Sequence, residues 1–422
     1  MKRVSFPLAL SLLGIAFSAQ ARVVYVDQNA VGPAHDGSYW PTAYLTVTAG
    51  LSAAGTANEV WVAKGTYTEN VSPGAGAALY GGFAGTETAR AQRDWRANPT
   101  ALDAGGNTGD VMSCAVQGVV VDGFTLRNGR YGVYVSGGAV RLANCAMTGN
   151  GEAVDVRSGT VTLANTAIVG NAEAVDIWGG VGTLAADAIT GNNGNGVFVY
   201  GGAVTLANVV IAGNGNDGVD VYQGTAALVN TLVATNHRDG VGVYNGFGGL
   251  GGKATLVNSI VAFNGGNGVF KDTQGSIPAI SHNDVFGNAG GDYSGLTPPT
   301  NTNNLSQDPL LTDRANGNYR LQAGSPCIDA GDDAIVTAGE TDLDGKPRIS
   351  GLHVDIGPYE YDLSRAPFVA ADVKRALAIA AGFSAPAPTD LPRLNVESGG
   401  AGVDLSDGVS LARKVTGQEA NP

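Results

Sequence analysis

The sequence predicts an all-β fold, a parallel β-helix in which short strands wind around one long core. One phrase returns about every 21 or 22 residues between Val119 and Asn288. Within each unit, apolar residues alternate with other residues at the period of two that strands show. The unit is also too short to contain a crossover helix. Self-similarity at a fixed short period is typical of a solenoid, in which each coil stacks on the next.

Every unit has the same parts in the same order. An apolar-x-apolar strand comes first, with middle residues Tyr134, Asp155, Asp176, Phe198, Asp220, Gly242 and Phe270. A second strand follows around Leu142, Leu163, Leu184, Leu206, Leu228 and Leu256. Two residues later stand Asn144, Asn165, Ala186, Asn208, Asn230 and Asn258. The unit ends at Asn150, Asn171, Asn192, Asn214, Asn236, Asn264 and Asn288.

Stacked units would pair each strand in parallel with its copy, about 4.7–4.9 Å away. Asparagine at a turn tolerates the left-handed conformation and can hydrogen-bond its copies above and below. The alternative all-β folds, a sandwich or a propeller, would need longer units with hairpin turns.

The first 21 residues predict export. Lys2 and Arg3 precede an apolar run from Phe6 to Phe17, and Ala19-Gln20-Ala21 offers a small-residue cleavage site. We therefore expect a secreted or cell-surface protein whose mature chain begins at Arg22. No other stretch is long and apolar enough to predict a membrane span.

The net charge limits the possible binding partners, and the cysteine count limits the possible disulfides. The net charge is −13 and the isoelectric point is about 4.6, which argues against nucleic acid and anionic lipid as partners. The three cysteines, Cys114, Cys145 and Cys327, cannot all pair within one chain. They are expected to be buried free thiols.

Residues 22–118 predict an amino-terminal cap and the first coils. Strands are expected at Val23–Asp27 and from Glu59, with a turn at Asp36-Gly37. Helical spacing runs from Thr42 to Ala54. An open parallel edge invites aggregation, so a short helix here would cap the solenoid.

Two markers give the chain a family resemblance. The first runs from Val24-Tyr25-Val26-Asp27 through Gly65-Thr66-Tyr67 and Leu79–Glu87 to Arg93-Asp94-Trp95. It resembles the amino-terminal region of bacterial secreted right-handed parallel β-helix repeat proteins, which share the pectin-lyase-like fold. The second, at Ser325–Gly331, Thr341–Ile349 and Val354–Tyr361, resembles their choice-of-anchor Q region. The resemblance implies a right-handed helix but no particular reaction, because fold does not fix function.

The outward strand column suggests a binding site. Asp155 and Asp176 should lie about 5 Å apart in register, close to the separation of about 5–5.5 Å in a retaining glycosidase. Facing carboxylates destabilise a ladder unless something binds them, and calcium takes such ligands. Tyr134 and Phe198 on the same stripe could stack on sugar rings. The alternative is that an exposed strand face simply carries polar residues.

A second cluster suggests catalysis. His237, Arg238 and Asp239 follow Asn236 at a turn, one coil from Asp217 and Asp220. The Gly-rich insertion Asn245–Lys253 comes next, and inserted loops often carry function. Such residues could transfer protons or bind an anionic sugar, as in a polysaccharide lyase or a glycoside hydrolase. The motifs of polygalacturonase-like enzymes are missing, and an ordinary charged turn is the alternative.

The carboxy-terminal part divides into two regions. Residues 291–361 contain the anchor-like region, where Asp342 and Asp344 form part of a calcium-loop pattern that lacks a downstream glutamate. Residues 362–422 repeat a loop and helix with an offset of 35 residues between Asp372 and Asp407. They resemble a dockerin module with degenerate calcium loops, which implies a cohesin-like or cell-surface attachment partner.

These observations predict a right-handed single-stranded parallel β-helix with regular repeats at 119–290, a cap helix and a small helical tail. The predicted function is binding of extracellular polysaccharide, with calcium as a candidate cofactor. Two alternatives stay open: a polysaccharide lyase or glycoside hydrolase, and a structural adhesin.

Overall fold

The structure is a computed structural model that describes residues 22–361, apart from residues 57, 107–108, 247–249 and 298–299. The predicted signal segment at 1–21 and the dockerin-like module at 362–422 lie outside the described residues. Within the described part, no helix has the length and apolar character needed to cross a membrane.

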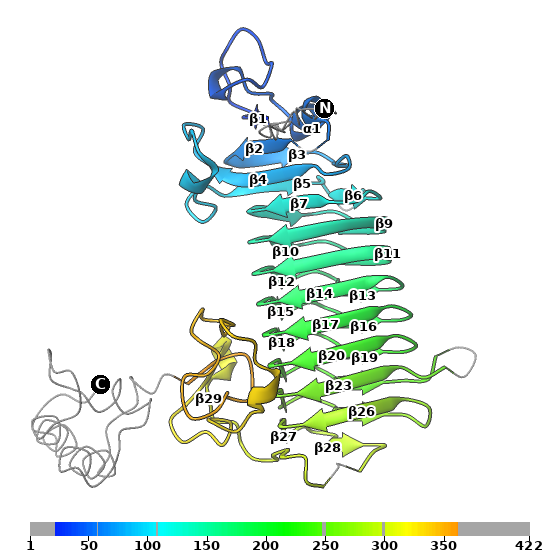
Figure 1. Ribbon diagram of the computed structural model, residues 1–422. Coiled ribbons are helices and arrows are strands. Elements are labelled where there is room, and N and C mark those ends of the chain that lie inside the picture. The colour runs from blue at the N-terminus through cyan, green and yellow to red at the C-terminus, as the bar shows by residue number, and fades with distance from the viewer. Residues whose placement is uncertain (1–21, 57, 107–108, 247–249, 298–299, 362–422) are drawn as a thin grey trace, which may run out of the picture.

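The parallel β-helix is confirmed, and its coils present three sheet faces (Figure 1). The first face contains β6 (Met112–Cys114), β9 (Tyr131–Ala143), β11 (Glu152–Ala164), β13 (Glu173–Ile177), β16 (Val197–Val199), β19 (Val219–Val221), β22 (Val241–Val243), β25 (Asn267–Lys271) and β28 (Gly291–Ser294). The second contains β1 (Val23–Val26), β2 (Glu59–Ala63), β4 (Ala78–Phe83), β7 (Val119–Asp122), β14 (Val181–Ala185), β17 (Ala203–Ala207), β20 (Thr225–Val229), β23 (Lys253–Val257) and β26 (Ser276–Ser281). Strands β9 and β11 turn the corner and join both faces, since their two halves pair with different strands.

The third face is a separate ten-stranded parallel sheet. Its strands are β3 (Gly65–Thr68), β5 (Thr100–Asp103), β8 (Phe124–Arg127), β10 (Ala146–Thr148), β12 (Ala167–Val169), β15 (Ala188–Thr190), β18 (Val210–Ala212), β21 (Leu232–Ala234), β24 (Ile260–Ala262) and β27 (Asp284–Phe286). The repeated valines, leucines and isoleucines of all three faces point inward and form one continuous core. Alternation at period two therefore buries one side of every strand and leaves the other for function.

The asparagines of the repeat form two columns. One column adopts the left-handed turn conformation, and the other hydrogen-bonds to its copies above and below. Asn144 and Asn165, between the second and third faces, adopt φ of 52° and 53°, and Ala186 adopts 58° at the same turn. The unit-ending asparagines are buried instead and form a ladder. In that ladder Asn171 Nδ2 donates to Asn192 Oδ1 at 3.0 Å, and Asn192 Nδ2 donates to Asn214 Oδ1 at 3.0 Å. Each amide satisfies its neighbour, so a polar column is tolerated inside the core.

The amino-terminal end is capped by helix α1 (Val47–Ala54), as predicted, but the helix begins later than Thr42. The preceding residues form a 3-10 turn, η1 (Trp40–Thr42). Thr46 starts the helix because its side chain accepts the Ala49 amide, and Glu69 accepts the Val47 amide at 2.7 Å. Val47 and Leu51 are buried against the first coil, so the helix closes the end of the core.

Residues 311–361 form a cover over part of the third face (Figure 1). The cover contains the antiparallel pair β29 (Leu311–Asp313) and β30 (Asn318–Leu321), with 3-10 turns η4 (Arg314–Asn316) and η5 (Asp333–Ile335). A further 3-10 turn, η2 (Arg90–Gln92), lies in an amino-terminal loop. Beneath the cover, the outward residues of the third face are Val210, Leu232 and Ile260, and they pack against Leu321 and Ile356.

The expectation of buried free thiols is confirmed. Cys114, Cys145 and Cys327 are all buried and unpaired. Cys145 points into the core at the turn between the second and third faces, and Cys327 joins the cover to Asp284 through a thiol hydrogen bond of 3.3 Å.

Candidate functional site

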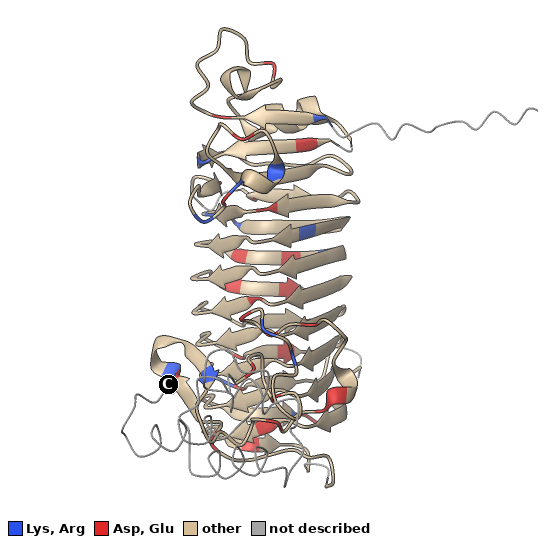
Figure 2. Cartoon of the chain, turned by 60° about the vertical axis from the view of Figure 1, so that its left-hand side comes forward, with Lys and Arg blue, Asp and Glu red and all other residues tan. Residues whose placement is uncertain are grey.

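Acidic residues stand on the first face in two columns, which we call the acidic columns; Asp and Glu are red in Figure 2. The turn column contains Glu152, Glu173, Asp217 and Asp239, and the strand column contains Asp155, Asp176 and Asp220. Glu152 pairs with Glu173 and Asp155 with Asp176 in the register of β11 and β13, as the sequence predicted. Phe198 lies between Asp176 and Asp220 in the same ladder. Side chains from separate repeats therefore form one continuous surface.

The strand column is not an exposed polar surface. Asp155, Asp176 and Asp220 are 0%, 7% and 6% exposed, and one carboxyl oxygen of each, Oδ1, is buried without a hydrogen-bond partner. Burial, reinforced by neighbouring carboxylates, raises the pKa of Asp176 and of Asp220 to about 8. Both groups are therefore neutral acids near pH 7. A simple solvent-facing strand would show neither property.

Arg157 organises the upper part of the acidic columns. Its Nη2 atom donates to Asp155 Oδ2 at 2.6 Å, and its guanidinium lies 4.6 Å from the ring centre of Trp178. Burial, followed by the neighbouring Asp155 carboxylate, raises the pKa of Glu152 to about 7, and Glu152 Oε2 is buried without a hydrogen-bond partner. This part of the face therefore combines one carboxylate paired with Arg157 and a buried carboxyl group whose burial favours the neutral form.

Tyr244 organises the lower part. Its hydroxyl lies 2.9 Å from Asp217 Oδ2 and 3.0 Å from Asp239 Oδ2. The phenol has one proton, so it can donate fully to only one of the two carboxyl oxygens. The second contact becomes a hydrogen bond if that carboxyl group is itself protonated and donates to the phenol oxygen. Gly242 makes this arrangement possible, because a Cβ atom there would lie 2.4 Å from the Tyr244 ring. Burial raises the pKa of Asp217.

An aromatic row runs beside the acidic columns, and the sequence interpretation missed it. Its members are Trp178, Tyr200, Tyr222 and Tyr244, each just beyond the end of a first-face strand. Successive ring centres are 5.4, 6.5 and 5.3 Å apart. Phe198 packs against three of these rings. The signal was available, because the four residues recur every 22 positions, two residues after the strand column.

The aromatic row opens into a cleft of about 560 Å³. Trp178, Phe198, Tyr200 and Tyr222 form its walls, and Asn245 and Gly246 of the predicted insertion close one side. Trp178 remains 38% exposed. The described start of the insertion, Asn245 and Gly246, therefore lies beside the aromatic row.

The other predicted site residues of the first face are Tyr134, Arg238 and His237. Tyr134 stacks on Tyr131 with ring centres 5.1 Å apart, at the upper end of the first face. The Arg238 side chain is 60% exposed, and its Nε lies 3.8 Å from Asp217 Oδ1. His237 is exposed, and within the described part of the chain its side chain has no hydrogen bond or ion pair with the carboxyl groups. The structure thus brings Asp217, Arg238 and Asp239 together and leaves His237 outside.

In the described part of the chain, no three His, Cys, Asp or Glu side chains are arranged to hold a metal ion. Asp155 is bound to Arg157. In the cover, Asp342 Oδ1 accepts the backbone amides of Asp344 and Lys346, and Asp344 pairs with Arg320. Calcium takes six to eight oxygen ligands, and calcium binding at these residues stays a prediction.

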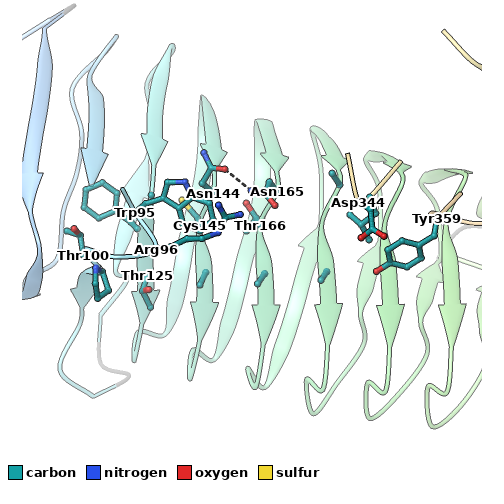
Figure 3. A pocket seen from close by; sticks show the side chains of 18 of the residues that line it. Trp95, Arg96, Thr100, Thr125, Asn144, Cys145, Asn165, Thr166, Asp344 and Tyr359 are labelled. Atoms are coloured by element: carbon teal, nitrogen blue, oxygen red, sulfur yellow. Dashed lines mark hydrogen bonds between the residues drawn. The ribbon is translucent and has the colours of Figure 1, made fainter. Parts of the chain in front are cut away.

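A second groove, of about 480 Å³, runs along the turn between the second and third faces (Figure 3). Its lining includes Trp95, Arg96, Asn144, Asn165, Asp344 and Tyr359. The polar groups largely bind one another: Asn165 Nδ2 donates to Asn144 Oδ1 at 2.7 Å, and Arg320 Nε donates to Asp344 Oδ2 at 2.7 Å. This groove makes a weaker case for a ligand than the first face, whose buried carboxyl oxygens are unpartnered.

Comparisons with known proteins support the fold. The family model described as "Right handed beta helix region" matches residues 111–248. Among solved structures, pectate lyase Pel9A aligns with a TM-score of 0.56 and 14% identity, over 82% of this chain and 97% of that chain. The A-module of mannuronan C-5 epimerase AlgE6 from Azotobacter vinelandii aligns with a TM-score of 0.32 and 16% identity, over 62% and 93%. A search of the curated proteins found no match. The pectate lyase likeness shows the fold alone.

Proposed function

We propose that the protein binds a polysaccharide along its first face. One observation carries the proposal: the aromatic row and the acidic columns lie side by side on one sheet, in the same register over successive coils. Aromatic rings pack against the apolar faces of sugar rings, while carboxyl groups hydrogen-bond to sugar hydroxyls. A fixed β-ladder holds both in place before binding, which limits the entropy lost on association.

The dimensions suit an extended chain. The four rings of the row span three coil spacings, roughly 14–15 Å at about 4.8 Å per coil. A monosaccharide would cover only part of this surface, whereas a polymer could contact several rings at once. One structural neighbour is named a pectate lyase, which agrees with a polysaccharide ligand.

The predicted location fits such a ligand. The signal-like segment at 1–21 supports export, and the dockerin-like segment at 362–422 supports attachment to a cohesin-like or cell-surface partner. Both inferences rest on sequence alone. An exported, attached solenoid would present its first face to extracellular polysaccharide.

The test is affinity electrophoresis and calorimetry of the mature protein against a panel of neutral, acidic and amino polysaccharides. Tyr200→Ala and Tyr222→Ala should each weaken binding about tenfold or more, because each removes a stacking surface. Tyr39→Ala, at an exposed tyrosine near the amino-terminal cap, is the matched control and should bind normally. Equal binding by all three variants would exclude the aromatic row as the site. Absence of binding to the whole panel would favour a structural adhesin.

Hydrolysis or lyase chemistry is a second candidate, favoured by one observation. Burial raises the pKa of both Asp217 and Asp220, and Asp217 also lies within ion-pair distance of Arg238, which opposes the rise. A carboxyl group that stays protonated near pH 7, beside one that a cation helps to ionise, is an arrangement in which a general acid and a base or nucleophile can act. The same panel should therefore be assayed for reducing ends and for the absorbance of unsaturated products. If an activity is found, Arg238→Ala should abolish it without lowering the melting temperature; a fully active variant would exclude this site.

A further inference from the structure

The charge on the first face selects among polysaccharides. From Glu152 to Tyr244 the acidic columns contribute Glu152, Asp155, Glu173, Asp176, Asp217, Asp220 and Asp239. Over the same coils, the described basic side chains of this face are Arg157 and Arg238, and each already pairs with one of those carboxylates. A polyuronate offers this surface no positive charge, and its carboxylates would lie against whichever carboxyl groups of the columns are ionised, which weakens binding. The surface is complementary to positive charge.

Three carboxyl oxygens of the strand column lack a hydrogen-bond partner. The Oδ1 atoms of Asp155, Asp176 and Asp220 are buried without partners. Leaving buried acceptors unpaired costs free energy, and a charged donor satisfies a carboxylate more strongly than a hydroxyl does. Asp176 and Asp220 flank Phe198 in the ladder, directly beside the cleft lined by Phe198 and Tyr200. The two acids do not line the cleft themselves, but each is the ladder neighbour of Phe198, so a sugar stacked in the cleft would carry its substituents toward them.

We infer that the first face recognises a polymer of amino sugars, with the aromatic row stacking on the rings and Asp176 and Asp220 receiving the ammonium groups. This inference rests on the proposed function and specifies its ligand class. Neutral glycans would gain only the stacking contribution, and polyuronates would be repelled.

Binding should release protons. In the free protein near pH 6, Asp176 and Asp220 are protonated. Asp176 faces Glu152, Glu173, Asp155 and Arg157, and Asp220 faces Asp217, Asp239, Glu173 and Arg238. An ammonium group that arrives beside either acid favours its ionised form, so the carboxyl proton leaves to solvent as the ion pair forms. A ligand without a positive charge would not displace that proton.

The experiment compares three ligands of equal length by isothermal titration calorimetry at pH 6: a glucosamine hexamer, its fully N-acetylated counterpart, and hexagalacturonate. The amine hexamer should bind at least tenfold more tightly than the acetylated one and should release protons, which buffers of different ionisation enthalpy will reveal. The double variant Asp176→Asn with Asp220→Asn should reduce that ratio to about one and abolish the release. These substitutions replace neutral acids by neutral amides of the same shape, so folding should be retained, as melting curves will check.

The outcomes separate the two proposals. If the acetylated hexamer binds as tightly as the amine, or hexagalacturonate binds most tightly, the amino-sugar inference is overturned while polysaccharide binding stands. If Tyr200→Ala weakens both hexosamine ligands equally while the aspartate variant affects only the amine, both proposals are supported. If no hexamer and no polymer of the panel binds, both fail together.

Discussion

Substituting Asp176 by asparagine should stabilise the protein, and increasingly so as the pH rises. Burial, reinforced by the neighbouring Glu152, Glu173 and Asp155, holds the pKa of the Asp176 carboxyl at about 8 in the folded state. In the unfolded chain the same group ionises near pH 3.9. Asparagine has the shape of the protonated acid but never ionises, so it removes the titration from the folding equilibrium.

The sign follows from proton binding in the two states. Between about pH 4 and pH 8 the folded protein keeps a proton on Asp176 that the unfolded chain has lost, so the free energy of unfolding falls as pH rises. The contribution is fully present below about pH 4 and decreases by about 1.4 kcal/mol per pH unit up to about pH 8. The advantage of Asp176→Asn should therefore be about 4 kcal/mol larger at pH 8 than at pH 5.

Differential scanning calorimetry at pH 5, 6, 7 and 8 measures this effect. With an unfolding entropy of about 2 cal/mol/K per residue, a chain of this length should show the melting-temperature gap widening by roughly 5 °C across that range. Asp36→Asn is the control, because hydrogen bonds from Ser38 lower the pKa of Asp36 to about 2 and leave it ionised in both states above pH 5. Its melting curve should run parallel to wild type. A parallel curve for Asp176→Asn as well would refute the burial argument for the strand column.

Three further predictions concern other parts of the fold. Asn192→Ala should lower the free energy of unfolding by about 3–5 kcal/mol in denaturant titrations, because it leaves buried ladder partners unsatisfied; a loss below about 1 kcal/mol would contradict the ladder's role. Gly242→Ala should displace the Tyr244 ring, weaken polysaccharide binding severalfold and leave the circular dichroism spectrum unchanged, whereas unaltered binding would show that the ring position is irrelevant. All three thiols should resist iodoacetamide until the protein unfolds, since each is buried and burial raises the pKa of Cys145 to about 12; mass spectrometry of the native protein would reveal early labelling.

The repeat predicted the backbone well because its signals are local. Alternation, glycine and asparagine positions, and a fixed period specify strand, turn and stacking directly, so the register of Asp155 against Asp176 followed from counting residues. The start of α1 was harder to predict from the sequence. Helical spacing extended back to Thr42, whereas the residue whose side chain caps the helix is Thr46, and only the structure shows that contact.

The site was harder to predict because burial on the outer surface is a collective property. Asp176 occupies an outward position, which alternation alone assigns to solvent, yet its side chain is almost fully buried. No local pattern distinguishes it from an exposed aspartate. The sequence interpretation missed the aromatic row because its residues follow the first-face strands, where no site residue was predicted, although they recur every 22 positions. His237 shows the converse error, since nearness in sequence to Arg238 and Asp239 did not place its side chain among the carboxyl groups.

The three faces share one backbone, so their outward residues show where the chain has been specialised. On the second face, one outward column from β9 to β23 reads Arg141, Thr162, Thr183, Thr205, Ala227 and Thr255, and threonine is a residue that favours strands. On the third face the column changes from Ala146, Ala167 and Ala188 to Val210, Leu232 and Ile260, and the change occurs where the cover begins. Apolar residues there are explained by packing. Aromatic rings also face outward on the second face, where Tyr25, Trp61 and Tyr80 stand in register, but Trp40 and the side chains of Arg90 and Arg93 pack against them. On the first face the acids and the aromatic row are turned outward together, and the proposed polysaccharide would cover both.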